Sequence, residues 1–405
     1  MRTRLLLVVL ISLGPSAAQA GTIVTGLGSG GAPQVRVFDS GTATPLSSFL
    51  AYGATFTGGV RVAAGDVNGD GVTDIVTGAG PGGGSHIKVF DGATGAVLFS
   101  FFAFDPSFSG GVFVAAGDVN GDGKADIVAG ADAGGAPHVK VFDGVTGMVL
   151  RSFFAYDAQF SGGVRVAAGD VNGDGVADIV TGAGPGASSH VKVFDGHTGS
   201  VIRSFFAFDP SFSGGVFVAA GDVSGDGNTD IVVGADSGGS PHVKVFDAVT
   251  VAVIRSFFAF DPSFGGGVRV AAGDVNGDGI AEIVTGAGPG AGPHVQTFDG
   301  VTGALIGSFF SGAPGFTGGV FVAASSSQPV DTTIAAAGAA GFQQGVSLLQ
   351  NALRSLQLGD SVSACNMLDG FIHQVEAQAG KKLTVEQANQ LTALALNDRI
   401  AIGCR

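Results

Sequence analysis

The sequence predicts an all-β fold, a six-bladed β-propeller closed by both of its ends, followed by a small all-α module of three helices. An acidic loop returns every 52 residues, with its first Asp at positions 66, 118, 170, 222 and 274. Each repeat holds four short segments rich in β-branched or aromatic residues, bounded by Gly, Pro, Asp or Ser, as strands are. Four antiparallel strands in a repeat of this length are typical of a propeller blade.

The four strands of the first full repeat are expected at 59–64, 74–78, 86–91 and 98–104. The first two consist largely of Gly, Ala and Val, which suits the narrow space near a propeller axis. The fourth contains the run SFFAF, which suits the wider space at the rim. This taper accounts for the 32 Phe of the chain.

Both ends of the array are expected to share one blade. The repeat region 21–324 begins with a second strand at Ile23 and ends with a first strand at 318–324. The second strand and the first strand each occur six times, so the count gives six blades. A shared blade would latch the ring and remove its exposed edges.

The acidic loops are candidate calcium sites. Their spacing, D-x-N-x-D-G-x-x-D, offers side-chain oxygens at positions 1, 3, 5 and 9 and a backbone carbonyl at position 7. All ligands are oxygens, which favours calcium over zinc or copper. The expected ligands of about five ions are Asp66, Asn68, Asp70, Val72 and Asp74; Asp118, Asn120, Asp122, Lys124 and Asp126; Asp170, Asn172, Asp174, Val176 and Asp178; Asp222, Ser224, Asp226, Asn228 and Asp230; and Asp274, Asn276, Asp278, Ile280 and Glu282.

The charge balance supports bound cations. The net charge is −14, yet the five loops hold fifteen of the 33 acids, and the other 18 nearly balance the 19 Lys and Arg. The alternative interpretation is that Asp and Asn only cap β-turns, which would leave the clustered carboxylates uncompensated. Ser224 and Glu282 depart from the pattern, so weaker binding is expected in the fourth and fifth loops. No basic run suggests a nucleic-acid partner.

Two further series recur along the repeats. A His opens the third strand in five copies and Gln34 replaces it in the first; a hydrogen-bonding role in the fold is favoured over ligand binding or catalysis. The five are His86, His138, His190, His242 and His294. The first strands alternate Arg61, Phe113, Arg165, Phe217, Arg269 and Phe321. This series is read as cation–π stacking between blades, as ordinary packing, or as a cationic ring for an anionic ligand. No nucleophile–base pair is recognisable.

Outside the repeats the chain changes character. Residues 1–20 read as a secretory signal peptide with cleavage near Ala20, and no later segment is apolar enough to be a membrane candidate. Residues 325–341 read as a linker. Residues 342–405 show a helical period, with a capping box at Thr384 and Gln387. Cys365 and Cys404 would pair after export.

Two resemblances follow from these motifs. The run GDVNGDG with DIVTGAG and VKVFDG resembles the FG-GAP/VCBS-type repeats of integrin-like β-propellers over 21–324. This implies calcium at the loop residues named above and an extracellular interaction role, although integrin propellers have seven blades. The run LDGFIHQVEAQAGKKLTVEQANQL resembles the FIMAH module of secreted bacterial proteins over 342–402.

Three functions are compatible with the sequence. The first is a secreted, monomeric, calcium-binding propeller that acts as an extracellular interaction or adhesion module for a protein or glycan. The second is a secreted hydrolase or lyase acting on polysaccharide, with its site at the central opening. The third is a structural surface protein without a small ligand. The absence of an asymmetric catalytic cluster favours a protein that is not an enzyme.

Overall fold

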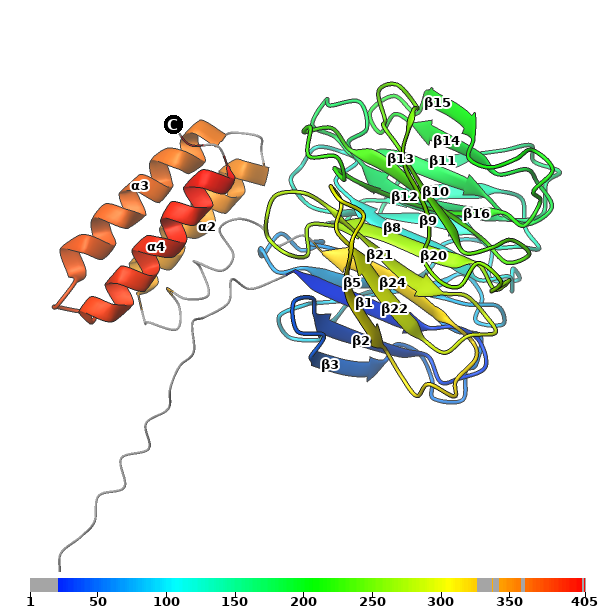
Figure 1. The fold of residues 1–405 in the computed structure, drawn as a ribbon, viewed down its shortest axis with the longest axis horizontal. Coiled ribbons are helices and arrows are strands. Elements are labelled where there is room, and N and C mark those ends of the chain that lie inside the picture. Colours follow the sequence, from blue (N-terminus) through cyan, green and yellow to red (C-terminus); the bar gives the residue numbers. More distant parts are fainter. Residues whose placement is uncertain (1–20, 326–336, 338–341, 358–360, 403, 405) are drawn as a thin grey trace, which may run out of the picture.

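Six four-stranded antiparallel sheets form the β region, and each sheet is one blade of a propeller (Figure 1). The structure is a computed structural model that describes residues 21–325, 337, 342–357, 361–402 and 404. The predicted six-bladed fold is confirmed.

The strand bounds follow the repeat closely. Blade 1 combines β24 (Val320–Ser325), β1 (Thr22–Leu27), β2 (Gln34–Asp39) and β3 (Pro45–Leu50). Blade 2 contains β4 (Val60–Gly65), β5 (Asp74–Ala79), β6 (His86–Phe90) and β7 (Val97–Phe102). Blade 3 contains β8 (Val112–Gly117), β9 (Asp126–Ala131), β10 (His138–Phe142) and β11 (Val149–Phe154).

The other three blades repeat this order. Blade 4 contains β12 (Val164–Gly169), β13 (Asp178–Ala183), β14 (His190–Phe194) and β15 (Val201–Phe206). Blade 5 contains β16 (Val216–Gly221), β17 (Asp230–Ala235), β18 (His242–Phe246) and β19 (Val253–Phe258). Blade 6 contains β20 (Val268–Gly273), β21 (Glu282–Ala287), β22 (His294–Phe298) and β23 (Leu305–Phe310).

Blade 1 is the latch of the ring, as predicted. The antiparallel register of β1 and β24 runs from Thr22 opposite Ser325 to Leu27 opposite Val320. The hydroxyls of Thr22 and Ser325 also share a hydrogen bond of 2.8 Å. Residues about 300 positions apart are thereby joined in one sheet, which closes the propeller.

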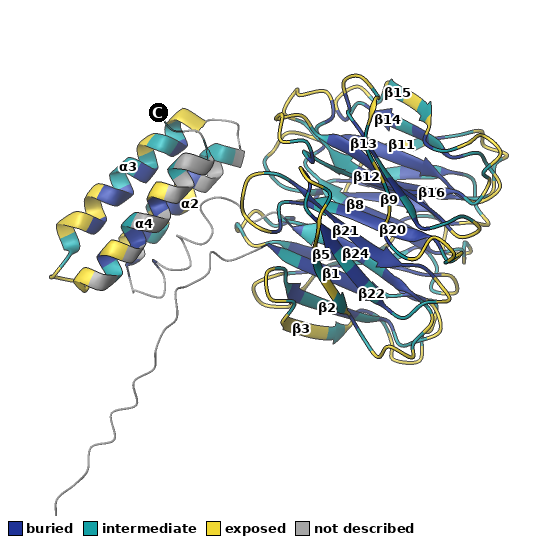
Figure 2. Cartoon of the chain, in the orientation of Figure 1, coloured by how far each residue is buried: buried dark blue, intermediate teal, exposed yellow. Residues whose placement is uncertain are grey.

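The core lies along the inner two strands of each blade (Figure 2). The innermost strands, β4, β8, β12, β16, β20 and β24, each pack on the next around the ring. The fourth strands correct the expectation that their Phe run fills the rim. Phe101 does pack on Phe142 of the next blade, with ring centroids 4.7 Å apart, but Phe102 is 51% exposed. Successive strand side chains point to opposite faces, so one Phe packs on the next blade and the following one is exposed.

Three helices form a separate bundle, α2 (Gln343–Gln357), α3 (Ser361–Gln378) and α4 (Val385–Ala401) (Figure 1). Leu349, Leu368, Phe371 and Leu391 fill its core. Val362, in the first turn of α3, is 73% exposed. None of the described helices is long and apolar enough to cross a membrane.

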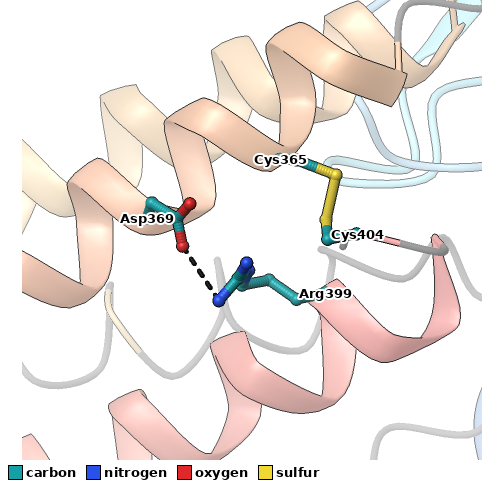
Figure 3. The surroundings of a disulfide bond; sticks show 4 residues. All are labelled: Cys365, Asp369, Arg399 and Cys404. Atoms are coloured by element: carbon teal, nitrogen blue, oxygen red, sulfur yellow. Dashed lines mark ion pairs between the residues drawn. A yellow bond between two sulfur atoms is a disulfide. The ribbon is translucent and has the colours of Figure 1, made fainter.

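The bundle is closed by a disulfide and an ion pair (Figure 3). Cys365 on α3 and Cys404 after α4 form the predicted disulfide, with Cα atoms 5.6 Å apart. Asp369 and Arg399 pair at 3.0 Å on the same two helices. The capping box is also present, since Gln387 N–H donates to the Thr384 hydroxyl and Thr384 N–H donates to Gln387 Oε1.

Some expectations fall outside the described residues. They are the signal peptide at 1–20, the helix break at 358–360 and nearly all of the linker.

Candidate functional site

Each acidic loop joins the innermost strand of a blade to the second strand, and all five lie at the same end of these hairpins. In blade 2 the loop follows Gly65, which is opposite Asp74 in the register. Gly69 and Gly71 have φ values of +77° and +85°, a region that glycine enters without strain. The two glycines let the chain turn tightly enough to bring the acids together.

The first acid of the loop is surrounded by backbone amides. Asp66 Oδ1 accepts hydrogen bonds from the N–H groups of Gly69 at 2.7 Å and Asp70 at 3.2 Å. Its Oδ2 accepts from Gly71 N–H at 2.8 Å. The same three bonds recur at Asp118, Asp170, Asp222 and Asp274. Turn capping, the alternative interpretation, is therefore present in these loops.

The acid at the ninth position accepts hydrogen bonds from backbone amides at the base of the loop. Asp74 is fully buried, and its Oδ2 accepts from the N–H groups of Val67 at 2.9 Å and Asn68 at 3.1 Å. Its Oδ1 accepts from Gly92 N–H, which follows the third strand, at 2.9 Å. Each carboxylate oxygen has two acceptor sites, so amide capping leaves capacity for a cation.

Amide bonds do not neutralise the acids. The ion pairs among the described residues involve no acid of the first four loops. Burial raises the pKa of Asp74, Asp126 and Asp178 to about 6, and that of Glu282 to about 7. Neighbouring loop acids add to these shifts, because like charges disfavour ionisation. The first four loops thus combine buried carboxylates with negative charge that no ion pair among the described residues compensates.

Two observations test whether these residues fit a cation. Asp230 is fully buried in the fourth loop, and its Oδ1 has no hydrogen-bond partner. In the fifth loop, carboxylate oxygens of Asp278, Glu282 and Asp299 lie within 4.8 Å of one another. An orphaned carboxylate oxygen and a cluster of oxygen donors both suit a hard divalent cation.

Sequence reasoning missed one set of acids beside the loops. Asp91 follows the third strand, and its Oδ2 accepts a hydrogen bond from Asn68 Nδ2 at 3.2 Å. The same contact joins Asn120 to Asp143 and Asn172 to Asp195. The signal was available, because this Asp follows the last loop acid by 17 residues in each of the five copies.

The predicted carbonyl ligand at position 7 stays a prediction. The hydrogen bonds found there come from the backbone N–H, as when Val72 donates to Asp70 Oδ1 at 2.8 Å. The same pattern holds at Lys124, Val176, Asn228 and Ile280.

The recurring histidines form hydrogen bonds within the blades, the role that the sequence reading favoured, although their serine partners were not foreseen. His86 Nε2 lies 2.9 Å from Ser100 Oγ on the neighbouring strand, and four more blades repeat this His–Ser pair. Each pair places an imidazole within hydrogen-bond distance of a hydroxyl, a contact that the sequence alone did not reveal. In blade 1, Gln34 donates to Ser48 at 3.0 Å in the same place. An amide serves equally well there, which supports the favoured structural role.

The alternating arginines and phenylalanines meet on the axis at the opposite end of the inner strands. The rings of Phe113, Phe217 and Phe321 lie 6.0–6.3 Å apart, centroid to centroid. Each arginine lies over two of these rings, for example Arg61 at 4.8 Å from Phe113. The cation–π interpretation is confirmed, and side chains fill the central opening at this level.

Two of these arginines have acidic partners in the next blade. Arg61 forms an ion pair with Asp132, and Arg165 forms one with Asp236 at 2.6 Å. All four side chains are buried. The acids come from the ends of β9 and β17, which the repeat spacing alone does not bring next to the arginines.

The fold and loops define the chain as a six-bladed β-propeller with acidic hairpin loops. Residues 58–99, 162–202 and 266–304 match the FG-GAP repeat, and residues 118–181 match the FG-GAP-like repeat. The chain therefore carries FG-GAP repeats.

Several solved structures are similar to this chain at low sequence identity. A protein of unknown function from Bacteroides caccae is 13% identical, with a TM-score of 0.46 over 75% of this chain and 98% of that chain. The WD40 repeats of RRP9 are 13% identical, with a TM-score of 0.42 over 68% and 74%. The exotype rhamnogalacturonan lyase YesX is 13% identical, with a TM-score of 0.34 over 68% and 64%. These values carry no conclusion about activity.

Proposed function

We propose that this chain is a secreted calcium-binding β-propeller that acts as an extracellular interaction or adhesion module for a macromolecule or glycan. The observation that carries the calcium part is the buried, uncompensated carboxylates of the loops, above all the orphaned Oδ1 of Asp230. Extracellular calcium-binding modules have dissociation constants of about 10⁻⁴–10⁻³ M. Free calcium outside the cell is abundant enough to saturate sites of this modest affinity.

The loop acids and Asn or Ser at positions 1, 3, 5 and 9 would hold the ion, which would neutralise their charge. The loops also contact one another: the carbonyl of Asp66 accepts from Ala125 N–H at 2.8 Å in the next blade. Asp118 and Asp222 make the same contact with Ala177 and Ala281. An ion that fixes one loop would therefore also support the junction with the following blade.

An extracellular setting is supported by the chain's chemistry. The Cys365–Cys404 disulfide persists in oxidising compartments and is rare in the cytosol. The N-terminal pattern of a signal peptide agrees with this setting.

The outer strands offer a repeated surface for a partner. Each of five blades presents one half-exposed Phe packed against the recurring His, such as Phe102 on His86 with ring centroids 4.7 Å apart. The others are Phe154, Phe206, Phe258 and Phe310. A surface repeated around a ring suits a partner that is itself repetitive, such as a glycan, because several weak contacts act together.

The test is a glycan and matrix-protein array probed with the mature chain, with calcium and with chelator. We expect binding that is lost in chelator together with folded structure, and weakened in a Phe154→Ser, Phe206→Ser double variant. Phe56→Ser, which alters a Phe away from the outer strands, is the matched control. Shortening of a polysaccharide without stable binding would overturn the proposal in favour of an enzyme. No binding in either condition would favour a structural protein.

A further inference from the structure

At the end of the inner strands that carries Arg61, Arg165 and Arg269, here called the arginine end, two arginines have an acidic partner and the third does not. The ring repeats every two blades, as Arg61, Arg165 and Arg269 show. In each case the partner position lies in the following blade, at the end of its second strand. That position is Asp132 for Arg61 and Asp236 for Arg165, but Gly28 for Arg269.

Gly28 cannot be regarded as an open place for a side chain. A Cβ there would lie 1.9 Å from the carbonyl oxygen of Gly318. The chain closes tightly around this glycine where β1 meets β24. Charge balance for Arg269 therefore does not come from this position of the fold.

The donors of Arg269 are only partly used. Its Nη1 donates to the carbonyl of Ala287, in its own blade, at 2.9 Å. Its Nε is buried without a partner. The other two arginines use Nη2 for their acids, whereas no hydrogen bond from Nη2 of Arg269 is found among the described residues. The Nε–Nη2 edge of this guanidinium is thus the unused one.

Arg269 also forms no ion pair among the described residues. Its side chain is buried, and burial together with Arg61 and Arg165 lowers its pKa to about 10, although Asp236 partly offsets this. The group is still charged at neutral pH. A buried charge without a counter-charge is costly, so this end of the ring favours an anion.

We propose that Arg269 binds the carboxylate group of a small ligand through its Nε–Nη2 edge, with one oxygen at Nη2, where Asp132 and Asp236 bond the other two arginines, and the second at Nε, which is unpartnered in all three arginines. A guanidinium edge and a carboxylate match in plane and spacing and form two parallel charge-assisted hydrogen bonds. Phe217 and Phe321, whose centroids lie 5.6 and 4.7 Å from the guanidinium, hold it in position.

The site lies apart from the acidic loops. Arg269 is the second residue of β20 and Gly273 is the last, so about 13 Å of strand separates the arginine from the fifth loop. Because Arg269 is only 7% exposed, only a small carboxylate, or one at the end of a chain, can reach it. Carboxylate binding is therefore expected to be independent of the calcium proposal, provided the propeller is folded.

The test uses the full mature chain and ¹³C-labelled acetate, whose relaxation reports binding, with thermal melting as a second readout. We expect saturable binding at one site per chain and a rise in melting temperature. Arg269→Gln should weaken binding about tenfold or more, the change expected when hydrogen bonds to a charged group are lost. Arg203→Gln, at an arginine on the outer strand β15 that bonds the carbonyl of Ala248, should bind acetate as the wild type does.

A second variant and a second anion keep the test decisive. Arg269→Lys retains the charge but loses the planar fork, so acetate binding should weaken while chloride binding does not. Wild-type stabilisation by chloride but not by acetate would overturn the carboxylate assignment. Equal acetate binding by the wild type and by folded Arg269→Gln would overturn the site itself. The measurement is repeated with calcium and, where the chain stays folded, with chelator, which separates this outcome from that of the calcium proposal.

Discussion

At one end of the inner strands stand the fifteen acids of five loops, and at the other stand three arginines. Ring closure brings like charges together at both ends. At the arginine end the fold supplies its own compensation, through aromatic faces and two buried acids from neighbouring blades. At the loop end backbone amides cap the acids, and no cation among the described residues forms an ion pair with the acids of the first four loops. Two of the three arginines thus have their counter-charges within the fold, whereas for the loops we propose that calcium ions supply the counter-charge.

The largest effect is expected from breaking the arginine end. Asp236→Asn removes the acid that pairs with Arg165 and leaves a buried cation uncompensated. The free energy of unfolding should fall by about 3–5 kcal/mol, measured by urea denaturation. Asp209→Asn, an exposed acid that only caps Ser211, is the control and should cost far less. Equal losses in the two variants would mean that the buried pair contributes nothing special.

A smaller effect is expected from one acidic loop. Asp170→Ala removes the first acid of the third loop and its three amide bonds. At a calcium concentration ten times Kd, loss of one site should remove about 1.4 kcal/mol of calcium-dependent stability. The readout is the difference between melting in calcium and melting in chelator, and it should shrink by roughly one site's share. An unchanged difference would show that this loop binds no ion.

The turn beside the fourth loop carries a strained residue. Val251 has φ +58°, where the preceding repeat has Gly199 at φ +74°. A β-branched residue is disfavoured in this conformation, so Val251→Gly should stabilise the propeller by about 1 kcal/mol. Ala43→Gly, at φ +54° in blade 1, is the matched comparison and should gain less, because Ala is not β-branched. A drop in melting temperature for Val251→Gly would contradict the assignment of strain.

The smallest effect is expected from repairing the fourth loop. Ser224→Asn restores the residue that the other four loops have, and with it the side-chain carbonyl at position 3. The calcium affinity of this loop should rise, seen as a lower calcium concentration at half-maximal thermal stabilisation. In chelator the variant should melt like the wild type, and a shift there would point to an effect on the turn alone.

Regular features of the sequence were sufficient for the fold. A strict 52-residue period fixes the blade count, and the matching strands at the two ends fix the latch, because both are local patterns that repeat. The contacts between distant positions were not accessible in this way. Asp132 lies 71 residues from Arg61, and Ser100 lies 14 residues from His86 across a hairpin, so both pairs depend on how strands and blades face one another.

The same distinction, between local sequence patterns and contacts made only in the folded chain, applies to the candidate sites. The loop acids were predicted as a set because their spacing is local. Their neighbour Asp91 was missed because it follows a different strand and approaches the loop only in the folded blade. The missing partner of Arg269 became visible only when the two complete pairs were in view.

The most direct test of the difference between the two ends is calcium binding by the mature chain, measured by isothermal titration and metal analysis with melting in calcium and in chelator. Five acidic loops predict about five ions per chain and a melting temperature that falls strongly when calcium is removed. One ion or none, with the same melting temperature in both conditions, would show that amide capping alone satisfies the loops and would contradict their dependence on ions.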